Sequence, residues 1–234
     1  MPLKSQDLRD HLESLLDGKR FTDQLLSKAI PEGRASHEQI GYFGILFYQH
    51  TTFTPRVLGT FLSRSEDPVI TSRIIDVIVD EETDFRCGEP HGKLALDFVT
   101  RFTGISGEEI KGMKKHPVAT ALGEFRLKCA RELPIQVAQA VPGIAGESST
   151  SAAFRVISDG LRENYGVKDE DQMSFIVHIE GDEGHSSAGF RTAEEYCTTD
   201  ELQQTLFDAV DKYSQAWANL WIESEKGLVD LPRS

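Results

Sequence analysis

Two histidines and an aspartate are spaced for metal binding in residues 178–185, which read His-Ile-Glu-Gly-Asp-Glu-Gly-His. On an α-helix, His178, Asp182 and His185 occupy positions i, i+4 and i+7, and at 3.6 residues per turn these positions share one face. Two imidazoles and a carboxylate on one stripe form a ligand set for a divalent transition metal. The apolar residues 175–177 just before them indicate that the stripe faces the interior, where ionisable groups are costly unless paired or metal-bound. A solvated acidic helix and a buried histidine satisfied by other groups are the alternatives that this pattern leaves open.

Further ligands must come from other helices, because a metal site in a helical bundle draws its ligands from several of them. Glu81 ends a strongly apolar helix predicted over residues 68–82, and His91 follows just past a Gly-Glu-Pro break. Glu147 opens a predicted helix after the break at residues 141–146 and is followed by small residues. The end of one helix and the start of the next can converge on one point, so these three residues are candidate ligands.

Competing carboxylates stand beside two of these candidates. Glu82 and Asp84 compete with Glu81, and Glu132 in the segment Ala-Arg-Glu-Leu-Pro competes with Glu147. The sequence does not choose between them.

The elements that must position these residues are helical nearly throughout, since strand-like alternation is scarce and hairpin turn dipeptides are absent. Capping residues and apolar periodicity predict helix starts and ends. They place starts at Ser36, Asp67-Pro68 and Thr199, an end at Tyr165-Gly166, one helix over 117–140 kinked at Pro134, and a loop or break over 141–146. The sequence therefore predicts an all-α fold, a single domain over residues 1–234 with about eight to nine helices.

Composition limits the classes of partner. The chain has 234 residues and a net charge of −13, which argues against nucleic acid and against an anionic membrane surface. No apolar run approaches the length that spans a bilayer, and the first residues lack the apolar segment of a secretory signal. The three cysteines, Cys87, Cys129 and Cys197, are odd in number and widely spaced, so we expect a reduced, cytoplasmic setting and no disulfide framework.

The order Glu81, His91, Glu147 and then His-x3-Asp-x2-His resembles the haem-oxygenase-like di-iron oxidases. The matching segments read DEETDFRCGEPHGKL, GIAGESSTSAAF and FIVHIEGDEGHSSAGF, and the metal-binding core that they define extends over about residues 36–220. The resemblance implies a haem-oxygenase-like helical bundle, as in thiaminase-type and PQQ-synthesis proteins, with non-haem iron. That family sometimes adds a carboxylate from the first core helix. Here the segment GYFGILFYQHTTF of that helix contains no acid, and Gln49 and His50 are its polar candidates.

The chemistry implied by this resemblance is oxidation by O2. Three histidines and three carboxylates divide into two half-sites, and mixed imidazole and carboxylate sites with open positions suit Fe(II) that binds O2. Zinc is disfavoured, because six ligands are too many for one tetrahedral ion. The resemblance thus implies two Fe(II) per chain, O2 as co-substrate and a small amine, amino acid or carboxylic acid as substrate, in specialised metabolite biosynthesis.

The sequence also offers candidate residues for substrate binding and leaves other functions open. A carboxylate-bearing substrate would favour an arginine in the pocket. The candidates are Arg73, Arg126, Arg131 and Arg155. Whether the protein forms a homodimer is left open. The alternatives are a metal-independent thiaminase-like hydrolase with a cysteine nucleophile, a haem oxygenase with His11 or His37 on the haem, and a non-catalytic helical binding protein.

Overall fold

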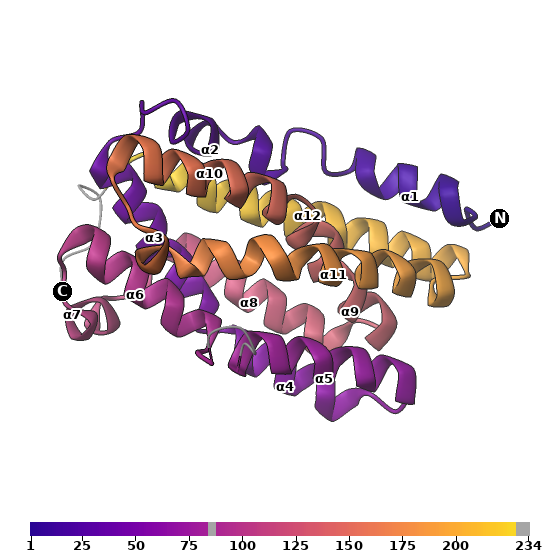
Figure 1. Cartoon of the computed structure of the whole chain (residues 1–234). Helices are drawn as coiled ribbons and strands as arrows, with labels where there is room; N and C mark the ends of the chain where they lie inside the picture. Colours follow the sequence, from indigo (N-terminus) through magenta and orange to yellow (C-terminus); the bar gives the residue numbers. More distant parts are fainter. Residues whose placement is uncertain (84–87, 228–234) are drawn as a thin grey trace.

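The protein folds as packed α-helices, with the long helix of residues 173–196 across the middle of the view (Figure 1), in a computed structural model that describes residues 1–83 and 88–227. Within the described helices, the side chains of Glu180, Asp182, Glu183 and His185 are outside the described part. The described residues hold no strand and twelve α-helices, two of which are only five and six residues long. The all-α prediction is confirmed, with somewhat more helices than expected. None of the helices described is long and apolar enough to cross a membrane.

The helices follow one another with short connections. Their bounds are α1 (Ser5–Ser14), α2 (Leu25–Ala29), α3 (His37–Thr51), α4 (Thr54–Arg64), α5 (Pro68–Thr83), α6 (His91–Thr103), α7 (Gly107–Gly112), α8 (Pro117–Glu132), α9 (Ile135–Ala145), α10 (Thr150–Tyr165), α11 (Met173–Tyr196) and α12 (Asp200–Ser224). Three short 3-10 turns precede α2, α10 and α11: η1 (Phe21–Asp23), η2 (Glu147–Ser149) and η3 (Asp169–Asp171).

Local capping chemistry sets most helix ends where the sequence predicted them. Ser36 and Gln39 form a reciprocal capping box at the start of α3. The Asp67 carboxylate accepts from the backbone N–H of Val69 and of Ile70, at 2.8 and 3.0 Å, at the start of α5. At the end of α10, Gly166 adopts a left-handed conformation with φ of 68°, which glycine accepts without steric cost.

Two predictions about the middle of the chain are wrong. Residues 117–140 form two helices and not one, because Pro134 stands outside both, as the N-cap of α9. Residues 141–146 are not a loop, since α9 continues to Ala145 with Pro142 inside it. Val141 and Ile144 are fully buried, so packing of α9 between α11 and α12 outweighs the local preference of proline.

Helix α11 is the central element, and it packs most extensively against α9 and α10. It crosses the middle of the view in Figure 1, below α10 and above α4 and α5. The contact with α9 is close because glycines meet there. A Cβ at Gly189 would lie 3.0 Å from the Ala140 carbonyl oxygen and 3.1 Å from Gly143 Cα. This close approach brings the C-terminal end of α9, and the Glu147 that follows it, near α11.

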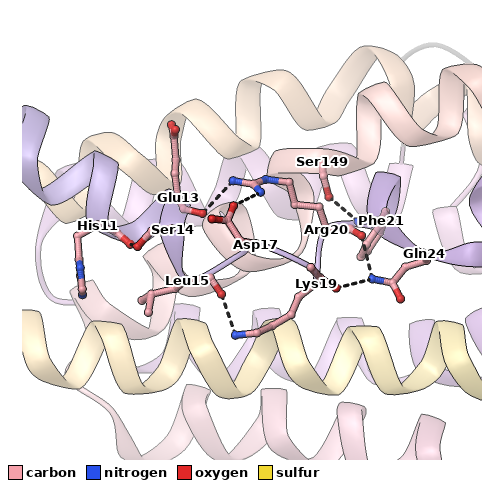
Figure 2. A network of polar contacts seen from close by, with 11 residues as sticks. His11, Glu13, Ser14, Leu15, Asp17, Lys19, Arg20, Phe21, Gln24 and Ser149 are labelled. Carbon is pink, nitrogen blue, oxygen red and sulfur yellow. Dashed lines mark hydrogen bonds and ion pairs between the residues drawn. The ribbon is translucent and has the colours of Figure 1, made fainter.

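Hydrogen bonds hold the connection between α1 and η1 against the core. Figure 2 shows Arg20 donating to the Asp17 carboxylate at 2.6 Å and to the Glu13 carbonyl at 2.8 Å, which holds the connection between α1 and η1 in place. The backbone N–H of Phe21 then donates to Ser149 Oγ at 3.0 Å. The connection is therefore joined directly to η2, the turn that carries Glu147.

Candidate metal centre

Three of the predicted ligands come together from three helices. Glu81 lies in the last turn of α5, His91 is the first residue of α6, and His178 lies in the second turn of α11. One ligand atom from each lies within 4.8 Å of the other two. His91 Nδ1 is 3.4 Å from the Glu81 carboxylate, and the rings of His91 and His178 have centroids 4.6 Å apart. Both histidines are buried, with exposed fractions of 1% and 8%.

The tautomer of His178 is fixed by its own helix. His178 Nδ1 lies 2.5 Å from the carbonyl oxygen of Ser174, one turn earlier in α11. A carbonyl only accepts, so Nδ1 must donate, and the lone pair of His178 is on Nε2. Metal-binding histidines almost always donate their other N–H in this way, because the bond orients the ring and raises its basicity.

Aromatic rings surround His178 on the side of the core. Phe47 of α3 and Phe154 of α10 stand edge-on to its ring, with centroids 6.0 and 5.7 Å away. The apolar shell limits the access of water, and such a shell controls the dielectric around a metal site.

Glu147 faces the same interior from η2. It lines two narrow cavities, of about 40 and 50 Å³, together with Glu81 and Arg126, and His178 borders the larger of the two. Burial raises the pKa of Tyr213 to about 12, with the Arg126 charge opposing this shift and the Glu147 charge adding to it. Among the described residues, however, Glu147 is not part of the three-residue group within 4.8 Å.

The remaining predicted ligands, Asp182 and His185, have side chains outside the described part. Their backbone lies in α11, which continues without interruption from Met173 to Tyr196, so positions 182 and 185 follow His178 by about one and two turns.

The competing carboxylates differ in their surroundings. Glu82 lines an outer cleft of about 560 Å³ beside Glu81, and burial together with the Glu81 charge raises its pKa. Glu132 is exposed at the end of α8, with Lys128 at 3.8 Å. Asp84 lies outside the described residues. Among the described carboxylates, Glu81 is therefore the one that meets two histidines.

Arg126 is the one candidate substrate arginine that reaches these cavities in the described structure. Arg131 and Arg155 are exposed, and Arg73 donates to Thr192 and to Glu195, both at 2.7 Å. Arg126 Nη1 donates to His50 Nε2 at 2.7 Å and to Thr54 Oγ1 at 3.1 Å. His50, the polar candidate on the first core helix, thus directs Nε2 to an arginine.

Comparison with known proteins decides the family. Residues 42–218 match a family described as iron-containing redox enzymes. The chain belongs to this family. No curated protein matches its sequence.

Solved structures show the same fold at low sequence identity. A domain of unknown function with a heme oxygenase-like fold from Shewanella denitrificans is 13% identical, with a TM-score of 0.75 over 97% of this chain and 94% of that one. A TenA homologue from P. horikoshii is 14% identical, with a TM-score of 0.73 over 96% and 100% of the two chains. A CADD-like protein of unknown function from Nostoc punctiforme is 15% identical, with a TM-score of 0.69 over 94% and 96%. These likenesses confirm the haem-oxygenase-like fold.

The residues present fit an iron of the kind that this family contains. Two ligands about 2.0–2.2 Å from one ion lie at most about 4.4 Å apart, and the 3.4 Å between His91 Nδ1 and the Glu81 carboxylate is within this limit. The donor set of two imidazoles and a carboxylate suits Fe(II) with open positions. The bond from His178 to Ser174 adds the supporting contact that such a ligand requires.

Sequence reasoning missed two supporting residues. Thr54 acts through its hydroxyl on Arg126, and Ser174 acts through its backbone carbonyl, which does not depend on the type of its side chain. The residue four positions before a candidate ligand on a helix is the signal that could have indicated Ser174.

Proposed function

We propose that this iron-containing redox enzyme is a non-haem di-iron oxidase or oxygenase, which uses O2 to oxidise a small amine, amino acid or carboxylic acid. The observation that carries the proposal is the convergence of Glu81, His91 and His178, from three helices, within 4.8 Å. Its membership of the iron-containing family supports a redox role for that convergence.

The ligands divide between two ions. Glu81, His91 and His178 would hold iron at the described group, and Glu147, Asp182 and His185 would complete the second position. Bound ferrous iron supplies the electrons for O2 reduction, which protein side chains supply poorly. Three carboxylates would offset most of the charge of two divalent ions.

The protein's own contribution is orientation and exclusion of water. The Ser174 carbonyl holds the His178 ring so that Nε2 is the free nitrogen, and Phe47 and Phe154 screen that ring from solvent. The Phe21–Ser149 hydrogen bond joins the N-terminal segment to η2, and Phe21 itself lines the cavity beside Glu147. The segment therefore closes one side of the site.

The test measures the iron bound per chain and then the visible absorption after O2 is added. We expect about two ferrous ions per chain after anaerobic loading, and a transient visible absorption when O2 is added. His91→Ala and His178→Ala should each lower the affinity for iron by at least about tenfold. His37→Ala is the matched control, because His37 is exposed and stacks on Phe102. Iron binding that survives both ligand substitutions would contradict the assignment.

The metal-independent hydrolase of the same fold requires an activated thiol. Cys129 and Cys197 are buried, and burial raises the pKa of each thiol to about 11, so neither is activated. Cys87 lies outside the described residues. A hydrolase would keep its activity after complete removal of iron, whereas the proposed oxidase would lose it.

A further inference from the structure

Arg126 is a partly buried cation without an ion-pair partner among the described residues. Its two hydrogen bonds go to neutral groups, the imidazole of His50 and the hydroxyl of Thr54, both through Nη1. Its Nε is buried and has no hydrogen-bond partner. Arginine side chains in protein interiors are normally paired with an anion, so the bare edge of this guanidinium indicates an anion supplied from outside.

His50 holds the guanidinium without neutralising it. A guanidinium only donates, so His50 Nε2 must accept, and the proton of the neutral imidazole is therefore on Nδ1. His50 is only 3% exposed, and its Nδ1 is a second buried donor without a partner. A negatively charged side chain at this position would have cancelled the charge of Arg126. A neutral acceptor fixes the side chain and keeps that charge available.

Two carboxylates in the same cavities could neutralise Arg126, but they are not available for this if they bind iron. Glu81 and Glu147 line both cavities with Arg126, yet neither forms an ion pair with it. Once their charge is shared with metal, Arg126 is the cationic group left to meet an anionic ligand.

The surroundings of Arg126 define the rest of the ligand. The smaller cavity is walled by apolar side chains from α4 and α5, namely Leu58, Phe61, Ile74 and Val77. At about 40 Å³, it accepts a few heavy atoms and not a bulky group. The outer cleft of about 560 Å³ shares Thr54 and Glu81 with the inner cavities and so lies next to them.

We propose that Arg126, oriented by His50 and Thr54, binds the carboxylate of a small monocarboxylic acid whose short apolar chain lies against α4 and α5. This assignment names the substrate class of the iron site and so rests on the proposed function. Arg126 thereby determines specificity, since it separates acids from the amines that the same iron chemistry could oxidise.

The experiment compares butyrate with butyramide, which have nearly the same shape and differ in charge. Binding to the full-length protein is measured by NMR titration, in the iron-free form and again with ferrous iron under anaerobic conditions. We expect the protein loaded with ferrous iron, in which the charge of Glu81 and Glu147 is shared with metal, to bind butyrate at least about tenfold more tightly than butyramide, because hydrogen bonds to a charged group are the stronger ones. Arg126→Met should remove this preference, and Arg126→Lys should retain it in weakened form.

The control is Arg131→Met, which removes the same charge from an exposed position of α8 and should leave the preference unchanged. Equal binding of butyrate and butyramide by the iron-loaded wild-type protein would overturn the inference, even if Arg126→Met does not fold. Butyrate binding that needs iron and survives Arg126→Met would also overturn it, because the carboxylate would then bind the metal. The iron count and the O2 reaction are measured separately, so failure of the proposed function is distinguishable from failure of this site.

Discussion

Two buried histidines of the same cavity have different roles because different groups hydrogen-bond to them. His178 donates through Nδ1 to the Ser174 carbonyl, which leaves Nε2 as the nitrogen for a metal. His50 accepts through Nε2 from Arg126, so that nitrogen is occupied. The side chains are chemically identical, and only the neighbouring donor or acceptor separates a candidate ligand from a residue that positions an arginine.

The buried state of His50 predicts a pH dependence of stability. Burial lowers the pKa of His50 well below its usual value, and the Arg126 charge lowers it further. The unfolded chain therefore binds a proton below about pH 6.5 that the folded chain does not, so the free energy of unfolding falls as the pH falls. The slope from this one group is up to about 1.4 kcal/mol per pH unit below pH 6.5.

Denaturant unfolding of the iron-free protein at pH 7, 6 and 5 measures this effect. His50→Gln keeps an acceptor for Arg126 and removes the titrating group, so its free energy of unfolding should fall less steeply with decreasing pH. His11→Gln, at a half-buried position beside Phe207, is the comparison. Identical slopes for the wild-type protein and His50→Gln would show that His50 is not the titrating group.

At the scale of the elements, the sequence predicted helix starts better than helix interruptions. Ser36, Asp67 and Thr199 cap helices where expected, because a cap depends on neighbours within three residues. Pro142 was expected to break the chain and lies inside α9, because that helix is held by α11 and α12, which are distant in sequence. Local sequence rules therefore predicted the helix starts, which depend on nearby residues, and failed for α9, whose continuity depends on packing.

Close helix contacts give a prediction at the same scale. In α10, a Cβ at Gly160 would lie 2.5 Å from Pro31 Cα and 2.8 Å from Pro31 N, which are backbone atoms that cannot rotate away. We expect Gly160→Ala to lower the free energy of unfolding by about 1–3 kcal/mol. Gly59→Ala, in α4 with nothing within 4 Å of the added Cβ, should instead raise it by about 0.5–1 kcal/mol. Denaturant unfolding of both variants checks the opposite signs.

At the scale of the whole molecule, the site depends on contacts that no local pattern contains. The His-x3-Asp-x2-His spacing indicated a metal-binding face on one helix, because periodicity is a property of that helix alone. The sequence could not choose between Glu81 and Glu82, since neighbouring residues on α5 point about 100° apart and only the packing of α6 and α11 decides which one meets the histidines. The pairing of Arg126 with His50 joins residues 76 positions apart and was likewise invisible.

The ligands of the candidate metal centre join α5, α6 and α11, and this predicts how metal binding changes the stability of the fold. A metal that binds only the folded chain raises the free energy of unfolding by about 2.7 kcal/mol when its free concentration is 100 times the dissociation constant. Hydrogen exchange with and without anaerobic Fe(II) should therefore slow most at residues 78–83, 91–95 and 174–179, with little local change in α1. His91→Ala should abolish both the added stability and the local slowing, because it removes the ligand contributed by α6. Equal slowing in α1 and at the three ligand segments would mean that iron stabilises the chain without joining these helices, and would refute the three-helix assignment.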